Sequence, residues 1–557
     1  MFKTTQTNNL ILFSLLILAI GIRIIYLEGD APAGDISNSA TFYADEGSYL
    51  LNSINLIRTG TPFQEDEVNI IVSTPVASFF YYLFFKLFGI SYFTARLATI
   101  LLSGFSLLII YFITKKDAPK YYFLILLLGA LNFFFIIYNR FAIFDNMLTT
   151  FLLLTSFCLF TFQQKQKSIW LILSALTFWM AFFVKGTGLF FLPVIVLFLY
   201  FETPSKIQFI KNISIFSLAS LVILLLTYLF WIQPNKEHWQ LYQSIVVLNR
   251  ISLNPVDLLY NFSRNIFNLK LFQFMPVAYT IFLFYCGALF TNIVTKKKTS
   301  ALERFFFIWA ISCFLFFSLN GYSPPRYWIT LLPPIIILNG IFFQKLFHSK
   351  FELSSKYFPT LIIFISILCV AQIAHGFYRI FSLHHNFISC YLPLISIVII
   401  IFFVLMKKGF FSQKPIGYIF ITLIMVIQLF QITNHYFNIK FSFIFSIRNV
   451  VKIIHQQESE NPVILGDLAT SIIFETNVKA VSLTPINKVE SKIIKNKPCF
   501  LLLQDNQKLE ILKEAFPSYF KNVILLKKYK IFENYYHRDF SYFYYIQSNN
   551  CPDTFPN

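Results

Sequence analysis

The stretch NLILFSLLILAIGIRIIYL, residues 9–27, is the first of the apolar runs that decide the fold of this chain. It approaches the roughly 20 apolar residues that cross the hydrocarbon core of a bilayer as a helix. Similar runs occur at residues 105–114, 121–138 and 215–232, and the series ends near residue 435. The sequence therefore predicts an α-helical membrane protein with many crossings.

Composition supports this class, since 57% of the 557 residues are hydrophobic and 13% are charged. The net charge of +19 comes from short basic clusters between apolar runs, a pattern typical of topology signals, so we expect no nucleic-acid partner. The motif APAG at residues 31–34 imitates a signal-peptide cleavage site. The preceding run is long for a signal peptide and contains Arg23, so we expect a retained anchor.

The positions of lysine and arginine predict the topology, because cytoplasmic loops are enriched in both. With Lys3 inside, the chain crosses at about 9–27 and returns at about 96–113. One helical hairpin then separates each basic cluster from the next, giving about 13 spans and placing the chain after about residue 436 outside. The inside clusters are Lys115–Lys120, Lys165–Lys167, Lys206–Lys211, Lys296–Arg304, Lys345–Lys356 and Lys407–Lys414.

One apolar stretch does not fit this alternation. The segment STPVASFFYYLFFKLFG, residues 73–89, is short, contains Pro75 and Lys86, and would invert every later loop if it crossed. We therefore interpret it as a helix in the outer interface, within a first outer loop of about residues 28–95. The alternative is an ordinary span, which would give about 14 crossings.

The composition changes after residue 436. Short strand-like runs, such as NPVILGD and KPCFLLL, alternate with helix-compatible segments such as NQKLEILKEAF. We therefore predict two parts: a transmembrane domain over residues 1–436 and a small external α/β domain over residues 437–557.

Ionisable residues gather at the predicted outer face. The first outer loop carries Asp45 and Glu46, and Asp145 lies at another outer membrane edge. Ionisable groups at this boundary are costly unless they are paired or hydrated, so the group together indicates a functional site. Alone, Arg96 or Arg140 is equally compatible with a side chain that reaches the lipid headgroups. The basic residues at outer ends of spans, which depart from the charge rule, are Arg96, Arg140, Lys185 and Arg326.

Transfer of a sugar from a polyprenyl phosphate suits such a mixture of charges. Departure of the sugar leaves a phosphate with added negative charge, which arginine and lysine stabilise. A carboxylate accepts the proton of the acceptor hydroxyl. A membrane groove that holds the lipid tail aligns donor and acceptor.

Several phrases, in their order along the chain, resemble the membrane glycosyltransferases of the GT-C type. They are the acidic pair, FGISYFTARL at residues 88–97, RFAIFDNML at 140–148, FVKGTG at 183–188 and PRYWITLLPP at 325–334. The branch that they resemble contains the bacterial relatives of protein O-mannosyltransferases and the lipid A aminoarabinose transferase. The resemblance covers residues 9–345 in sequence, and the later part only in layout.

This resemblance implies roles for individual residues. Asp45 is the implied general base, Glu46 contacts the acceptor or donor, and Asp145 supports the catalytic site or a divalent metal. Relatives often have Lys-Pro or His-Pro where this chain has Thr74-Pro75, which leaves the donor contact in the first loop, and the sugar, open. The residues implied for the donor-phosphate site are Lys185 and Arg326, with Arg96 and Arg140 in support.

The expected function is an inverting transfer from a polyprenyl-phosphate sugar to a hydroxyl or phosphate of a lipid, glycan or protein. We expect it in the cytoplasmic membrane, with the site and external domain on the outer, periplasmic side. Asp45 and Asp145 alone do not specify a metal, so no cofactor is predicted beyond a possible divalent ion.

Three other functions compete with this interpretation. A polytopic transporter has as many spans, although transporter charges commonly lie near the midplane and the halves repeat. A non-catalytic scaffold would use the external domain for binding. An oligosaccharyltransferase is disfavoured, since a Trp-Trp-Asp signature is expected in its external domain and no tryptophan follows Trp328.

Overall fold

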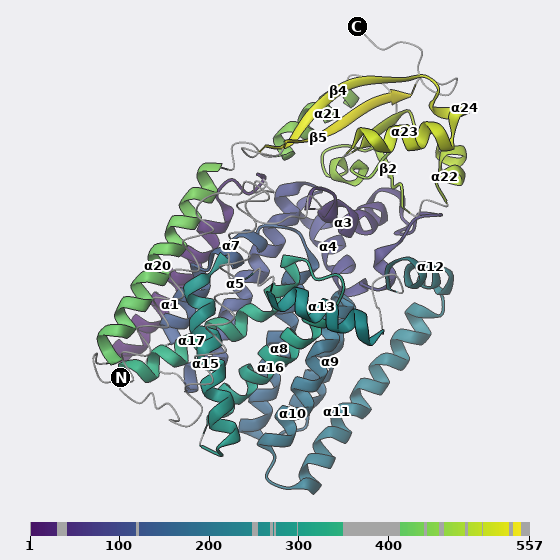
Figure 1. Cartoon of the computed structure of the whole chain (residues 1–557). Coiled ribbons are helices and arrows are strands. Elements are labelled where there is room, and N and C mark those ends of the chain that lie inside the picture. The colour runs from purple at the N-terminus through teal and green to yellow at the C-terminus, as the bar shows by residue number, and fades with distance from the viewer. Residues whose placement is uncertain are drawn as a thin grey trace.

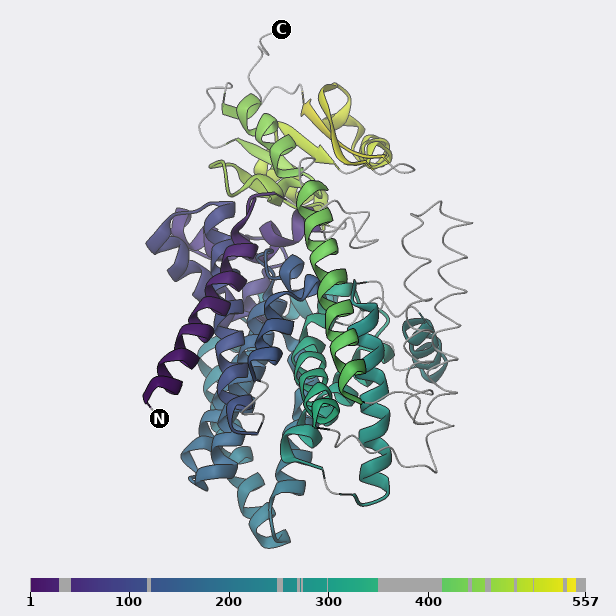
Figure 2. The ribbon, with the colours of Figure 1, turned by 90° about the vertical axis from the view of Figure 1, so that its left-hand side faces the viewer.

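The chain forms a helical bundle with a small sheet at one end (Figures 1 and 2). The structure is a computed structural model, which describes residues 2–29, 42–117, 122–247, 254–267, 271, 274–297, 299–348, 413–438, 443–455, 462–484, 488–503, 505–533 and 538–546. The bundle helices are α1 (Phe2–Ile24), α3 (Phe42–Thr59), α4 (Pro75–Phe88), α5 (Tyr92–Asp117), α6 (Tyr122–Ala130), α7 (Phe133–Tyr138), α8 (Phe144–Lys165), α9 (Ile169–Val184), α10 (Leu192–Glu202), α11 (Lys206–Thr227), α12 (Lys236–Tyr242), α13 (Pro255–Phe267), α15 (Pro276–Val294), α16 (Ala301–Leu319), α17 (Leu332–Phe347) and α20 (Gln413–Asn438).

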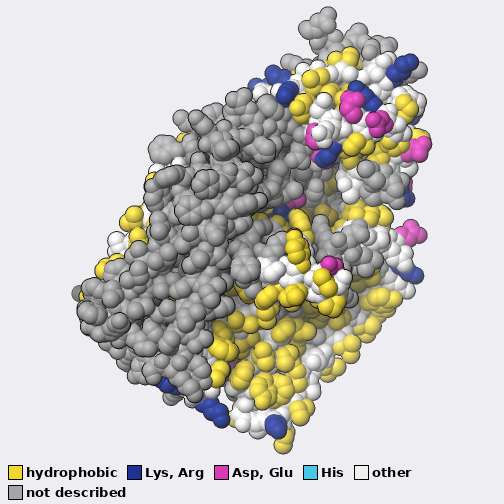
Figure 3. Space-filling model, viewed as in Figure 1, with side chains coloured by type: hydrophobic (Ala, Val, Ile, Leu, Met, Phe, Trp, Pro, Cys, Tyr) yellow, Lys and Arg dark blue, Asp and Glu magenta, His cyan; other side chains and the backbone are white. Residues whose placement is uncertain are grey.

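Within the described ranges, seven helices are long and apolar enough to cross a membrane. In Figure 3, hydrophobic side chains cover much of the described helical surface, while acidic and basic side chains gather over the sheet. The structure thus supports a multi-pass helical protein. It does not confirm the number of 13 spans, and residues 349–412, where we expect two of them, lie outside the described residues.

The helix α11 and its continuation stand at the edge of the bundle (Figure 1). The apolar segment Lys206–Ile232 is the most hydrophobic of the seven, yet only 11% of its most apolar stretch is buried in the protein. An apolar helix exposed on nearly all sides needs an apolar solvent. Lipid is the solvent that satisfies this surface.

The stretch that we interpret as interfacial forms α4, of 14 residues. At 1.5 Å per residue this helix is about 21 Å long, against about 30 Å of hydrocarbon. Gly89 follows it with a φ of +81°, a conformation that glycine adopts without strain, and α5 begins three residues later. The short length of α4 favours a position in the interface.

The end of the bundle beneath the sheet contains several short helical segments. They interrupt the long helices and bring polar residues to this level. Asn146, in the first turn of α8, donates to the carbonyl oxygens of Tyr138 (2.8 Å) and Phe141 (3.2 Å) and so fixes the turn between α7 and α8. The short segments of the bundle are η1 (Ile70–Val72), η2 (Gly186–Phe191), η3 (Tyr228–Ile232), η4 (Gln243–Val247) and η5 (Pro325–Leu331).

After α20, the described residues form a five-stranded sheet in the order β2-β1-β3-β5-β4. The β1 strand pairs in parallel with β2 and β3, whereas β5 is antiparallel to β3 and β4. Cys499, directly before β3, is disulfide-bonded. The elements are α21 (Phe443–His455), β1 (Val463–Leu465), η7 (Ala469–Ile472), β2 (Lys479–Val481), α22 (Val489–Asn496), β3 (Phe500–Leu503), α23 (Asn506–Ala515), α24 (Pro517–Phe520), β4 (Val523–Glu533) and β5 (Arg538–Ile546).

Candidate active site

The first acid of the outer loop forms an ion pair with an arginine that is distant in sequence. Asp45 lies in the first turn of α3, and its Oδ2 atom is 2.7 Å from Nη1 of Arg326, which belongs to η5. The arginine side chain is 3% exposed and the aspartate side chain 24%. Asp45 is therefore the member of the pair that a molecule in solution can reach.

A second ion pair joins two other elements. Asp145 lies in the first turn of α8, and Lys185 lies in the break between α9 and η2. The Nζ atom of Lys185 is 2.7 Å from each carboxylate oxygen of Asp145, and the aspartate is fully buried. Buried charges are tolerated when they are paired, so each residue explains the position of the other.

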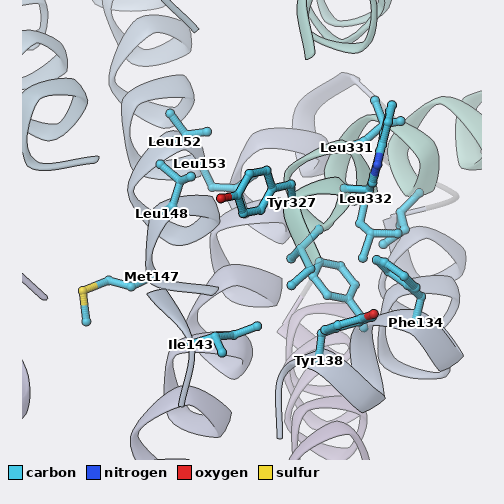
Figure 4. Close-up of a cluster of buried hydrophobic side chains, with 14 of the residues drawn as sticks. Phe134, Tyr138, Ile143, Met147, Leu148, Leu152, Leu153, Tyr327, Leu331 and Leu332 are labelled. Carbon is cyan, nitrogen blue, oxygen red and sulfur yellow. The ribbon is translucent and has the colours of Figure 1, made fainter. Parts of the chain in front are cut away.

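The aromatic ring of Tyr327 connects the two ion pairs. Lys185 Nζ lies 3.9 Å from the ring centroid, and Arg326 Cζ lies 5.7 Å from it. In Figure 4 the ring points from η5 toward α8, beside Leu148 and Leu153. The two cations thus contact the same aromatic ring at the edge of a hydrophobic core, an arrangement stabilised by cation–π attraction.

Tyr49 belongs to the same cluster, although it was not among the residues that the sequence indicated. It lies four residues after Asp45 on α3, so both face the same side of the helix, and its ring stacks on Phe144 at 4.7 Å. Burial raises the pKa of Tyr49 well above its usual value, against a smaller opposing effect of Arg326. Its hydroxyl therefore stays protonated and can donate a hydrogen bond. In the sequence DEGSY, Asp45 and Tyr49 are one helical turn apart, and this spacing is the signal that could have identified Tyr49.

Glu46, the neighbour of Asp45, pairs with a different arginine. Arg96 donates to both carboxylate oxygens, from Nε at 2.9 Å and from Nη2 at 2.5 Å, and the backbone N–H of Ala142 donates to Oε1 at 2.7 Å. Glu46 and Arg96 are both nearly fully buried. Their bidentate pair connects α3 to α5 and to the turn before α8.

Arg96 and Arg140 also bind carbonyl oxygens of the turn that follows α1. Arg140 donates to the carbonyl oxygens of Ile25 (2.6 Å) and Tyr26 (2.5 Å) and lies 5.1 Å from the ring of Tyr436. Arg96 donates to the carbonyl oxygen of Leu27 at 3.0 Å. The structure therefore brings Asp45, Asp145, Lys185 and Arg326 together, and places Glu46 with Arg96 beside them. Arg140 contacts the end of α1 instead.

Two buried hydrogen-bond donors of this region have no partner among the described residues. They are Nε of Arg326 and the hydroxyl of Thr187, which lies two residues after Lys185 in the GTG turn. A buried donor without a partner costs free energy, on the order of 1–3 kcal/mol. Both donors are suited to the oxygens of an anionic ligand.

The described residues contain no group of three histidine, cysteine, aspartate or glutamate side chains that could hold a metal ion. Asp45 and Asp145, the two possible metal ligands indicated by the sequence, each face a cation instead. The two carboxylates do not fit a divalent ion, because Arg326 and Lys185 already neutralise their charges.

Comparisons with known proteins identify the fold of the chain. Residues 72–231 match the family described as dolichyl-phosphate-mannose-protein mannosyltransferase, a range that contains Arg96, Arg140, Asp145 and Lys185. The crystal structure of ArnT from Cupriavidus metallidurans in the apo state superposes with a TM-score of 0.55 at 16% identity, over 95% of this chain and 97% of that one. The chain has the ArnT fold. The expected resemblance to GT-C glycosyltransferases is confirmed.

Two further similarities extend over much of the chain. A second structure of the same ArnT, bound to undecaprenyl phosphate, matches 97% of this chain with a TM-score of 0.48 and 14% identity, over 98% of that chain. An uncharacterized protein from Aquifex aeolicus (strain VF5) is 23% identical over 370 residues, which are 65% of this chain and 68% of that protein.

Proposed function

We propose that this chain is an inverting glycosyltransferase that moves a sugar from a polyprenyl-phosphate donor to an acceptor hydroxyl or phosphate. The observation that carries the proposal is the pairing of an accessible carboxylate, Asp45, with the buried Arg326, whose Nε has no partner among the described residues. The family that matches residues 72–231 is named for the same class of donor, a sugar on a lipid phosphate.

In the proposed reaction, the acceptor oxygen attacks the anomeric carbon of the donor sugar. The bond between that carbon and the phosphate oxygen breaks, and its electron pair stays on the phosphate. Asp45, whose side chain is partly exposed, takes the proton of the acceptor as a general base. Attack from the side opposite the phosphate inverts the anomeric configuration.

The leaving phosphate gains negative charge, which Arg326 and Lys185 are positioned to stabilise. Both cations lie against Tyr327 in a largely buried setting, where charge interactions are stronger than in water. The hydroxyl of Thr187 is a further donor on the Lys185 side. Asp145 holds the ammonium of Lys185 through both carboxylate oxygens.

The other residues act by positioning in this proposal. Glu46 is held by Arg96 and by the backbone of Ala142, so it fixes α3 rather than meeting a substrate. Arg140 secures the end of α1 through two carbonyl oxygens. Glu46, Arg96 and Arg140 thus hold the helices that carry Asp45 and Asp145.

We further propose that the site and the sheet face the outer, periplasmic side of the cytoplasmic membrane. Lys115, Lys165 and Lys345 lie at the ends of helices whose other ends carry the site, as the positive-inside rule requires. The disulfide at Cys499 supports an oxidising compartment for the sheet. The acceptor is a lipid, glycan or protein exposed on that side.

The test is to incubate the purified protein with a panel of polyprenyl-phosphate sugars and to measure release of polyprenyl phosphate. Lys185→Gln and Arg326→Gln should weaken donor binding roughly tenfold or more, because each removes a charge-assisted hydrogen bond. Matched controls at the opposite helix ends are Arg304→Gln and Lys345→Gln, which pair with Glu202 and Glu303. Movement of an intact donor across vesicles without cleavage would instead establish a transporter.

A further inference from the structure

The external sheet domain contacts the helix that carries Asp45. Its short segment η7 packs on α3, where the hydroxyl oxygens of Ser48 and Thr470 are 3.1 Å apart. Arg58, near the other end of α3, donates to the carbonyl oxygen of Ile473 at 2.6 Å. The two contacts seat α3 against the external domain along most of the helix.

Gly47 makes this contact unusually close. A Cβ atom at Gly47 would lie 2.0 Å from the carbonyl oxygen of Thr470, closer than any side chain permits. The backbones of α3 and η7 therefore touch at the residue that follows Asp45 and Glu46. A shift of η7 against α3 would move Asp45 relative to Arg326.

A second contact lies in the loop after α3, where three consecutive acids meet three lysines around α22. Asp66 pairs with Lys488 at 3.1 Å and Glu67 with Lys492 at 3.0 Å. Glu65 pairs with Lys495. The lysines are spaced by four and three residues, which places them on one helical face.

The central pair of this contact is buried, and the outer two pairs are more exposed. Lys492 also donates to the carbonyl oxygens of Ser482 (3.0 Å) and Thr484 (2.7 Å), and Glu67 accepts from the N–H of Ser482 at 2.9 Å. Exposed pairs add little stability, whereas a buried pair is strongly destabilised when one partner is lost. The contact therefore fixes one docked position of the domain.

The acidic segment is in turn fastened to α3. Asn69 donates to the carbonyl oxygen of Glu67 at 3.1 Å and accepts from Nδ2 of Asn52 at 2.9 Å. Asn52 lies on α3, and its side-chain oxygen also accepts from the N–H of Ile71 at 3.2 Å. The lysine face of α22 thus connects to the helix of Asp45 through a short, fully hydrogen-bonded path.

We propose that the external domain is a positioning element for catalysis: its docking through α22 and η7 sets the orientation of α3 and hence the distance between Asp45 and Arg326. This inference rests on the proposed function for its activity readout, but not for its structural readout. The residues that carry it are Glu65, Asp66 and Glu67 of the loop, Lys488, Lys492 and Lys495 of the domain, and Gly47 and Thr470 at the direct contact.

Charge reversal of the outer pairs tests the docking. Glu65→Lys with Asp66→Lys places like charges opposite Lys488 and Lys495 and leaves the buried pair intact. Docking is measured by the yield of a disulfide between cysteines introduced by Ser48→Cys and Thr470→Cys, which we call trapping. Each single cysteine variant is a control. We expect reduced trapping, faster hydrogen exchange of the α3 amides, and a kcat lower by roughly tenfold to hundredfold with little change in donor KM.

Rescue separates positioning from general damage. Adding Lys488→Glu and Lys495→Glu to the reversed loop restores opposite charges, so trapping, α3 exchange and kcat should all return. Unchanged trapping in the reversed loop, or parental α3 exchange in a protein that has lost trapping, would overturn the proposal. If the parent protein transferred no sugar from any donor, the proposed function would be rejected. Hydrogen exchange of the α3 amides would still show whether the external domain positions α3.

Gly47→Ala tests the direct contact without a change in charge. The added methyl group must displace η7 or α3, so we expect a fall in kcat of roughly tenfold or more and faster α3 exchange. Gly21→Ala is the matched control, because no described atom lies within 4 Å of the place that its methyl group would take, and it should behave like the parent. A Gly47→Ala protein with parental kcat and exchange would contradict the role of this contact.

Discussion

At the scale of residues, the site is a set of charges that compensate one another before any substrate arrives. Asp45 faces Arg326 and Asp145 faces Lys185, and the ring of Tyr327 contacts the cation of each pair. Pairing each acid with a cation offsets part of the cost of burying these four charges. The proposed anionic donor would change this balance, because its phosphate would compete with Asp45 for Arg326. Donor binding would then release the carboxylate that the reaction needs.

Asp45→Asn tests the proposed general base. The change keeps the shape of the side chain but removes the basic oxygen, so turnover should fall by on the order of a hundredfold or more in a folded protein. Asp45 also lies in the first turn of α3, where a carboxylate contributes about 0.3–1 kcal/mol to the helix. If helix stabilisation were its only role, the variant would melt slightly earlier and transfer at the parental rate, as measured with the correct donor.

Tyr49→Phe tests the residue that the structure adds to the site. The ring would keep its stack on Phe144, but the protonated hydroxyl beside Asp45 and Arg326 would be lost. We expect kcat to fall roughly tenfold with the melting temperature nearly unchanged, which corresponds to one hydrogen bond to a charged group. Phe144→Leu, which perturbs the stack and keeps the hydroxyl, is the control. Equal kcat for Tyr49→Phe and the parent would remove the hydroxyl from the mechanism.

The sequence indicated the members of this site but not their pairing. Departures from the positive-inside rule placed Arg326 and Lys185 at the outer face, and the adjacent acids identified Asp45. Which cation meets which acid depends on the crossing of η5, α8 and α9, which one sequence does not encode locally. Tyr49 was missed because an aromatic residue one turn from an acid is common on any packed helix.

At the scale of elements, arginines compensate the ends of broken helices. The last carbonyl groups of a helix have no partner within it, and in a membrane protein water is scarce there. Arg140 and Arg96 bind carbonyl oxygens of Ile25, Tyr26 and Leu27 in the turn directly after α1, and Arg23 binds the carbonyl oxygen of Ala130 at the end of α6 at 3.0 Å. These arginines are thus explained by helix termini as well as by any substrate.

Arg140→Met distinguishes the two roles of that arginine. Methionine keeps much of the side-chain volume but leaves the carbonyl oxygens of Ile25 and Tyr26 without this donor. We expect a loss of stability of about 1–3 kcal/mol, seen as a lower melting temperature in detergent, with donor KM unchanged. The exposed Lys165→Met change should leave stability near that of the parent. A raised donor KM at parental stability would assign Arg140 to the phosphate instead.

Hydrophobic runs predicted the helical class and the later strand-like runs indicated the sheet, because both patterns are local. The short segments η2 and η5 were not predicted, because their sequences, which include GTG and PRYWITL, look like parts of longer apolar runs. Their positions depend on packing against α8 and α16, which is a property of the assembled bundle. The site lies where these local patterns fail, and it is there that charged residues interrupt the apolar runs.

At the scale of the whole molecule, the long helices separate two chemically different ends. One end carries the site, the sheet and the disulfide at Cys499. Basic side chains at the other end include Lys165 at the end of α8 and Lys297 after α15. The candidate site at one end and the basic side chains at the other indicate a direction across the membrane.

Cysteine labelling tests this direction. Glu510→Cys lies on the exposed face of α23 and should react with a membrane-impermeant maleimide in right-side-out vesicles, because the sheet is expected outside. Lys297→Cys is equally exposed but belongs to the basic end, so it should react only after the vesicles are permeabilised. The parent chain controls for native thiols, of which Cys158, Cys286 and Cys313 are buried. Labelling of Lys297→Cys in intact vesicles would invert the topology and place the proposed transfer on the cytoplasmic side, where the acceptor would have to be a different molecule.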